Sequence, residues 1–82
     1  MGILDGFIED HSDILERTPY VTLREAWELY KKYVEDANLA YTFSMIRFRE
    51  ELKSYFGNYT ERELIDGMET RNVYRNFKQE NN

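Results

Sequence analysis

The chain has 82 residues and a mass of 10.0 kDa, the size of one small domain. It contains no cysteine, which excludes disulfides and thiolate metal sites. Hydrophobic residues make up 41% and aromatic residues 16%, too much for a disordered chain. With a single histidine and no cysteine, the sequence offers few groups for catalysis, so composition favours a binding module over an enzyme.

The formal net charge of −5 is unevenly distributed along the chain. Residues 1–39 contain nine acids and four bases, whereas residues 40–82 contain seven of each. We expect an anionic ligand to meet the second half, although mixed charge is also what keeps a small domain soluble.

No apolar run approaches the ~20 residues of a membrane span. Acids also interrupt the first apolar stretch, unlike in a signal peptide. We therefore expect a cytoplasmic protein without membrane contact. Its single domain is expected over residues 3–78, followed by a disordered tail over residues 79–82.

The N-terminal segment begins with apolar residues at helical spacing: Ile3, Leu4, Phe7 and Ile8. They predict a short helix that ends near His11. The polar stretch 10–18 predicts a connecting loop from which Ile14 and Leu15 turn inward. A short β-prone patch, Tyr20–Val21, follows it.

The clearest element is a long helix that starts after Thr22. Thr22 and Glu25 have the spacing of a capping box, and Asn38 suits the C-terminal end. One apolar stripe runs along the helix: Leu23, Ala26, Trp27, Tyr30, Tyr33, Val34 and Ala37. This periodicity predicts that the stripe faces a core.

A second helix is predicted after a short connection over residues 39–43, with Thr42 or Ser44 as its N-cap. Its apolar face contains Met45, Phe48, Leu52, Tyr55 and Phe56. We expect Gly57 to end the helix in a left-handed conformation.

Asp66–Gly67 indicates a turn between two β-capable runs, which predicts a C-terminal hairpin. The second arm, 71–78, has the stronger strand pattern. The first arm, 59–66, also contains a capping-box pattern from Thr60 to Glu63, so a short helix there remains an alternative.

This order of elements predicts an α+β fold, a winged helix-turn-helix with three helices and a C-terminal β-hairpin wing. In that architecture, the helix after the turn is the DNA reader and the hairpin lies beside it.

The segments 22–33, 45–52 and 71–77 together resemble the C-terminal winged-helix domain of phage and plasmid primase–helicases. The first matches a capped helix rich in Tyr and Trp, the second a basic-aromatic helix, and the third a strand flanked by bases. The resemblance covers residues 3–78 and implies that an NTPase motor domain of the same polypeptide precedes this domain. The chain itself lacks a phosphate-binding loop.

Four residues of the second helix are candidates for DNA contact: Ser44, Arg47, Arg49 and Lys53. Arg47 lies farthest from the apolar stripe, so we expect it to reach base edges, with Arg49 and Lys53 on phosphates. The alternative is a solvated face on which these cations pair with Glu residues of the same helix.

Three cations on the second hairpin arm are the remaining candidates: Arg71, Arg75 and Lys78. If Val73 and Phe77 are core residues, strand alternation puts Arg75 at an edge. If Tyr74 is the core residue, the arginines and Phe77 face outward as a strip suited to single strands.

No cofactor and no metal site are predicted, because the acids around His11 lack the spacing of metal ligands. The spacing of five aromatic residues indicates core positions, not a base-stacking platform: Trp27, Tyr30, Tyr33, Phe48 and Phe56. Tyr41 and Tyr59 are expected to be more exposed.

The leading hypothesis is a DNA-binding winged helix of a mobile-element replication primase–helicase, which engages origin or fork DNA to load or orient the motor. The alternative is a protein-interaction winged helix whose acidic half docks a basic replication partner or a neighbouring subunit. We expect the isolated domain to be a monomer, since neither long helix has a second apolar stripe.

Overall fold

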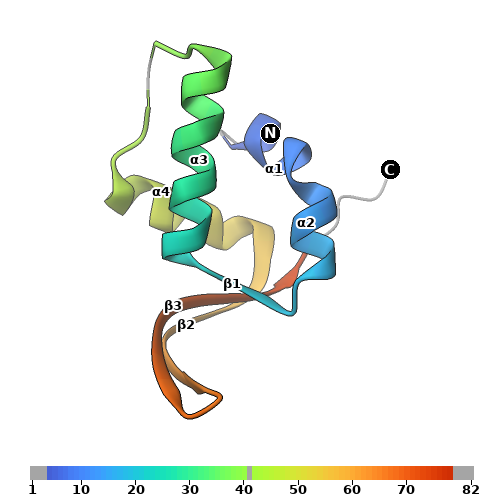
Figure 1. Ribbon diagram of the computed structural model, residues 1–82, viewed down its shortest axis with the longest axis vertical. Helices are drawn as coiled ribbons and strands as arrows, with labels where there is room; N and C mark the ends of the chain where they lie inside the picture. Colours follow the sequence, from blue (N-terminus) through green and yellow to red (C-terminus); the bar gives the residue numbers. More distant parts are fainter. Residues whose placement is uncertain (1–3, 41, 79–82) are drawn as a thin grey trace.

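The computed structural model describes residues 4–40 and 42–78. The predicted tail over 79–82, the start of the first helix at Ile3, and Tyr41 lie outside these residues. Within them the elements are α1 (Asp5–Asp10), α2 (Ser12–Arg17), β1 (Tyr20–Thr22), α3 (Leu23–Ala37), α4 (Met45–Leu52), the 3-10 helix η1 (Lys53–Tyr55), β2 (Phe56–Ile65) and β3 (Met68–Phe77). The fold is α+β: the helices gather at one end, and the hairpin of β2 and β3 extends from the other (Figure 1).

The polar stretch before Pro19 is helical, so the prediction of a connecting loop there, and of three helices in all, is wrong. Local hydrogen bonds support α2: the Ser12 hydroxyl donates to the Glu9 carbonyl at 3.1 Å, and the Thr18 hydroxyl to the Ile14 carbonyl at 2.9 Å. Such bonds satisfy backbone groups at helix ends. Leu15 is buried as predicted but Ile14 is exposed, because neighbouring helical residues point about 100° apart.

The long helix α3 has the predicted ends. The Glu25 amide donates to the Thr22 hydroxyl at 3.2 Å, and the Thr22 amide donates to the Glu25 carboxylate at 3.1 Å. Asn38 closes the helix in a left-handed conformation with φ of 55°. Both caps confirm the boundaries read from the sequence.

The helix α4 begins at its predicted cap, where the Ser44 hydroxyl accepts a hydrogen bond from the Arg47 amide at 3.2 Å. Its end differs from the prediction, because Gly57 lies inside β2 and has no left-handed conformation. A Cβ on Gly57 would lie 3.1 Å from the Asn76 Cβ, so glycine there permits close approach of two strands. Met45, predicted on the buried face, is exposed in the first turn of the helix.

The sheet is antiparallel with strand order β1-β3-β2. Asp66 and Gly67 form the two-residue turn of the hairpin, with φ of 52° and 78°. This conformation is that of a type I′ turn, which matches the twist of the flanking strands. The hairpin prediction is confirmed, and the short-helix alternative for residues 59–66 is wrong.

The two predicted orientations of β3 each hold in part: Val73 is buried and Phe77 packs against the core as the first predicts, and Tyr74 is buried as the second predicts. Val73 is 1% exposed and Tyr74 is 0% exposed, although neighbouring strand residues normally face opposite sides. Asn72 and Asn76 have φ of 53° and 61°, and these left-handed residues interrupt the regular alternation. Phe77 packs against the core instead of facing outward.

An aromatic core joins the helices, as the sequence predicts. Phe48, with 0% exposure, lies 4.7 Å from Tyr30, 5.3 Å from Trp27 and 5.8 Å from Phe7 between ring centroids. The aromatic stripe is therefore structural, and burial of this apolar area is the main stabilising contribution. Tyr59, expected to be exposed, is half-buried against the same core.

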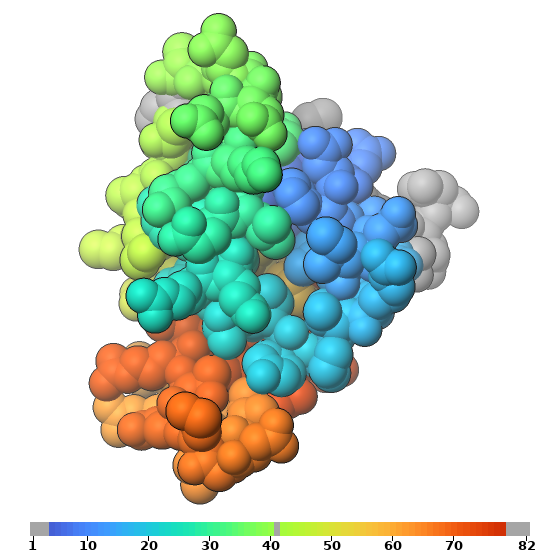
Figure 2. All heavy atoms as spheres, viewed as in Figure 1, coloured from blue at the N-terminus to red at the C-terminus, as the bar shows by residue number. Residues whose placement is uncertain are grey.

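In the space-filling view, α3 and the segment α1–α2 form one continuous body, and the tip of the hairpin lies at its end (Figure 2). Among the described residues, none of the helices has the length and apolar character needed to cross a membrane.

Candidate nucleic-acid interface

The helix α4 is fixed to the sheet through its buried face. Phe48 and Leu52 are buried, and the Tyr74 hydroxyl donates to the Arg49 carbonyl at 2.9 Å. This contact leaves the opposite face of α4, with Ile46 and Arg47, in solvent.

Each cation of α4 and of the turn after it has a carboxylate partner. Arg47 pairs with Glu51 at 3.1 Å, whereas Arg49 and Lys53 both pair with Glu50 at 3.2 Å. The hydrogen bond from Lys53, with a smaller contribution from Arg49, lowers the pKa of the Glu50 carboxyl. All these side chains are partly or fully exposed, so solvent screening keeps each pair weak.

Aromatic rings hold two of these cations in place. The Arg47 guanidinium lies 5.1 Å from the centroid of the Phe43 ring, and the Lys53 ammonium lies 4.4 Å from that of Tyr59. Because Tyr59 belongs to β2, the second contact brings the end of α4 to the root of the hairpin.

Arg75 lies apart from the cations of α4. It follows Tyr74, whose side chain reaches α4, so Arg75 extends from the other face of the sheet. There it forms an ion pair with Glu63, and its guanidinium lies 5.2 Å from the centroid of the Tyr20 ring. The hydrogen bond to Glu63 raises the pKa of Arg75. Arg75 therefore holds the hairpin against β1 and is not an open anion contact.

The other two predicted wing cations lie far apart along the second hairpin arm. Arg71 is exposed near the hairpin tip and has no ion pair with the residues that the structure describes. Lys78 follows the opposite end of the strand, where its amide donates to the Tyr55 carbonyl at 2.9 Å. The three predicted wing cations are therefore not gathered at one place.

Sequence reasoning missed Arg62, which lies directly opposite Arg71 in the hairpin register. Counting outward from the turn at Asp66–Gly67 pairs these two positions, so the signal was present in the sequence. Arg62 also forms an ion pair with Glu69 at 3.2 Å.

Acidic charge is concentrated on the helical body. The segment that forms α1, α2, β1 and α3, residues 4–39, has nine acids and four bases. The segment 42–78, with α4 and the hairpin, has seven bases and six acids. An anion therefore meets less repulsion at α4 and the hairpin than at the rest of the domain.

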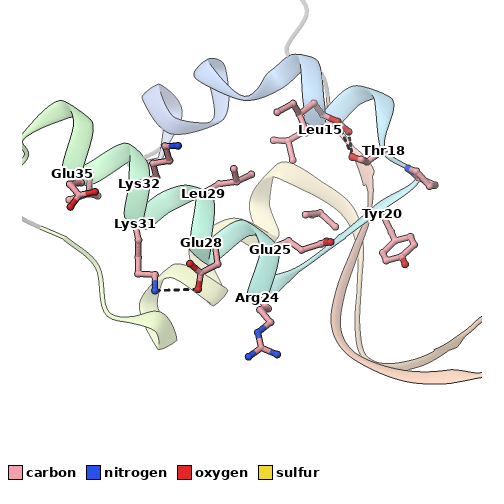
Figure 3. Close-up of a pocket in the computed structure, with 14 residues that line it drawn as sticks. Leu15, Thr18, Tyr20, Arg24, Glu25, Glu28, Leu29, Lys31, Lys32 and Glu35 are labelled. Carbon is pink, nitrogen blue, oxygen red and sulfur yellow. Dashed lines mark hydrogen bonds and ion pairs between the residues drawn. The ribbon is translucent and has the colours of Figure 1, made fainter.

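An open groove of about 1460 Å³ lies between α2 and α3. Figure 3 shows Leu15 and Leu29 from the two helices on its apolar side, with charged residues along α3. The acids and bases that line it are equal in number: Glu25, Glu28 and Glu35 against Arg24, Lys31 and Lys32. Its charge therefore selects no partner.

The described residues contain no group of three or more His, Asp and Glu side chains placed to hold a metal ion. His11 instead bonds through Nδ1 to the Phe7 carbonyl at 2.9 Å. Comparison of the chain with protein-family models, with curated proteins and with solved structures found no match in any of the three.

Proposed function

We propose that this domain is a winged helix-turn-helix that binds DNA through α4 and the β2–β3 hairpin. The order of elements supports the fold: α3 and α4 are consecutive helices, a hairpin follows them, and β1 completes the sheet. Its place would be in a mobile-element replication primase–helicase, where it engages origin or fork DNA to load or orient the NTPase motor.

The separation of charge carries this proposal. The net negative charge of the domain belongs to the α1–α3 body, which has nine acids and four bases, while α4 and the hairpin are close to neutral with a small basic excess. DNA approaching α4 and the hairpin keeps the acidic body at a distance, and at 0.1 M salt repulsion is screened beyond about 10 Å.

The ion pairs of α4 oppose DNA contact only weakly. Solvent screens these exposed pairs, so a phosphate can replace the glutamate on Arg49 or Lys53. Arg47, in the N-terminal half of α4, is placed to reach a base edge, where arginine pairs with guanine. With Arg71 and Lys78 added, four phosphate contacts imply a log–log salt slope of about −4.

An amide NMR titration of the chain with a short forked DNA at low salt tests this proposal. We expect shifts over residues 44–54 and around Arg71 and Lys78 that weaken as salt is raised. The double variant Arg47→Gln/Arg71→Gln should lose binding, whereas Arg24→Gln, an exposed control on α3, should retain it. Unchanged spectra at high DNA concentration would refute DNA binding.

A second test removes the acids that pair with the α4 cations and should raise DNA affinity instead of lowering it. Glu50→Gln/Glu51→Gln releases Arg47, Arg49 and Lys53 from their partners, so we expect DNA affinity to rise about 3- to 10-fold. The control is Glu28→Gln, which breaks a similar exposed pair on α3. A fluorescence anisotropy titration that finds equal affinity for both variants would contradict a role for the α4 face.

The acidic body favours a second candidate function, the docking of a basic replication partner or a neighbouring subunit. Glu9, Glu16 and Asp36 are exposed and form no ion pair with the described part of the chain. Under this alternative, Arg47→Gln/Arg71→Gln leaves partner binding intact, which distinguishes it from DNA binding.

A further inference from the structure

We infer that the tip of the β2–β3 hairpin is an apolar wedge that packs against the open end of a DNA duplex, where double-stranded DNA meets single strands. This inference rests on the proposed DNA binding. It begins with two side chains beside the turn, Leu64 and Met68, which are 74% and 70% exposed. Apolar side chains of this size are the ones that proteins insert between base steps.

The two apolar side chains lie on opposite faces of the hairpin. Leu64 is paired with Glu69 and Ile65 with Met68, and directly paired residues share a face. Leu64 and Ile65 are neighbours in the strand, so Leu64 and Met68 point to opposite sides. A tip with one exposed apolar side chain on each face, Leu64 beside Glu69 on one and Met68 on the other, fits between two surfaces better than flat upon one.

The tip also stands clear of the rest of the sheet. β1 pairs with Val73, Tyr74 and Arg75 only, so the outer part of the hairpin is a two-stranded ribbon. Figure 1 shows this part curving away from the helices. The Arg75–Glu63 ion pair and a hydrogen bond from Tyr59 to Asn72 join the two strands and stabilise the curvature of the hairpin.

Two arginines next to the apolar tip indicate which molecule the tip contacts. Arg62 and Arg71 are directly opposite each other and share a face with Leu64, two residues or roughly 6.6 Å farther from the turn. Like charges in this position repel unless an anion lies between them. Glu69 pairs with Arg62, and Arg71 is left for an outside anion. DNA presents phosphates beside flat apolar bases, which matches this combination.

The width of the ribbon indicates where on DNA the tip fits. Two paired strands lie about 4.8 Å apart before side chains are counted, and the minor groove is only about 6 Å wide. At a fork the strands are already separated, and the last base pair exposes one face. Leu64 and Met68 can contact that face and an unpaired base while Arg71 meets a phosphate.

The test uses the full 82-residue chain, a forked duplex with 2-aminopurine in its last base pair, and a closed duplex of the same sequence, in which a loop covers each end. We expect the chain to bind the fork more tightly and to raise the 2-aminopurine fluorescence as the base unstacks. Leu64→Ser/Met68→Ser should lower fork affinity about tenfold, abolish the fluorescence change and leave closed-duplex affinity unchanged. Both side chains are exposed, so the variant should fold.

Ile14→Ser is the matched control, because Ile14 is a 45% exposed apolar side chain on α2, outside both α4 and the hairpin. If it reproduces the effect of the tip variant, or if the tip variant retains the fluorescence change, the wedge is refuted while closed-duplex binding still supports the proposed function. If the tip variant loses a protein partner and no DNA property, the tip is a protein contact and the inference is wrong. If the chain binds neither DNA, both proposals fail.

Discussion

Removal of the Tyr74 hydroxyl should break the hydrogen bond that links β3 to α4 and lower the stability of the fold. The Tyr74 ring is fully buried, and its hydroxyl donates to the Arg49 carbonyl at 2.9 Å. The last carbonyls of a helix lack partners within the helix. At the end of α4, the Lys53 amide donates to the Glu50 and Glu51 carbonyls, so it does not replace Tyr74 as the donor to Arg49.

The expected cost of Tyr74→Phe follows from this geometry. The variant loses one hydrogen bond and leaves a partly buried carbonyl without this donor, which together cost about 1–2 kcal/mol. For 82 residues the entropy of unfolding is about 0.17 kcal/mol per kelvin, so the midpoint temperature should fall by roughly 6–12 °C. The ring remains, so no cavity contribution is expected.

Urea and thermal unfolding followed by Trp27 fluorescence measure this change. Tyr20→Phe is the control, because the Tyr20 hydroxyl forms no hydrogen bond with the described residues and its ring contact with Arg75 is retained. We expect the control to change the free energy of unfolding by less than about 0.5 kcal/mol. Equal stability of Tyr74→Phe and wild type, or an equal loss in both variants, would refute the hydrogen bond as a link between α4 and the sheet.

Three further predictions concern stability. Burial raises the pKa of Tyr74 and Tyr55, so the folded state keeps these protons at a pH where the unfolded chain loses them. The free energy of unfolding should therefore be constant below about pH 10 and fall as the pH rises above that value. In urea titrations, Tyr74→Phe should make this fall shallower. Thr22→Ala removes the capping box and should cost about 1 kcal/mol by urea unfolding, whereas Thr42→Ala should cost almost nothing. Gly67→Ala should lower the free energy of unfolding by about 1 kcal/mol, because Gly67 has a φ of 78° that alanine disfavours. No steric clash adds to this cost, since an added Cβ would meet no atom within 4 Å. An unchanged denaturation midpoint would contradict the turn conformation.

Features that depend on residues close together in the chain could be predicted from the sequence. The capping box at Thr22 and the Asp66–Gly67 turn each depend on residues close together in the chain, so both were predicted correctly. The stretch 10–18 was not, because its helix depends on local side-chain hydrogen bonds that polar residues also form in loops.

For the candidate site, the sequence identified the cations but not their partners. Arg47 and Glu51 are a local pair that helical spacing allows, and this pairing was anticipated as an alternative. The position of Arg75 was open, because left-handed Asn72 and Asn76 interrupt the alternation of β3. The ion pair with Glu63 depends on the bend of the hairpin, which no local pattern indicates.

The sequence by itself determined the order of elements, the ends of α3 and the turn of the hairpin, because hydrogen bonds and backbone preferences between near neighbours decide them. Only the tertiary structure decided which cations face solvent and which are held by acids. It also decided that Leu64 and Met68 stand exposed at the tip, since β1 is too short to cover the outer hairpin. These outcomes depend on contacts between residues far apart in the chain, and periodicity within one element carries no information about them.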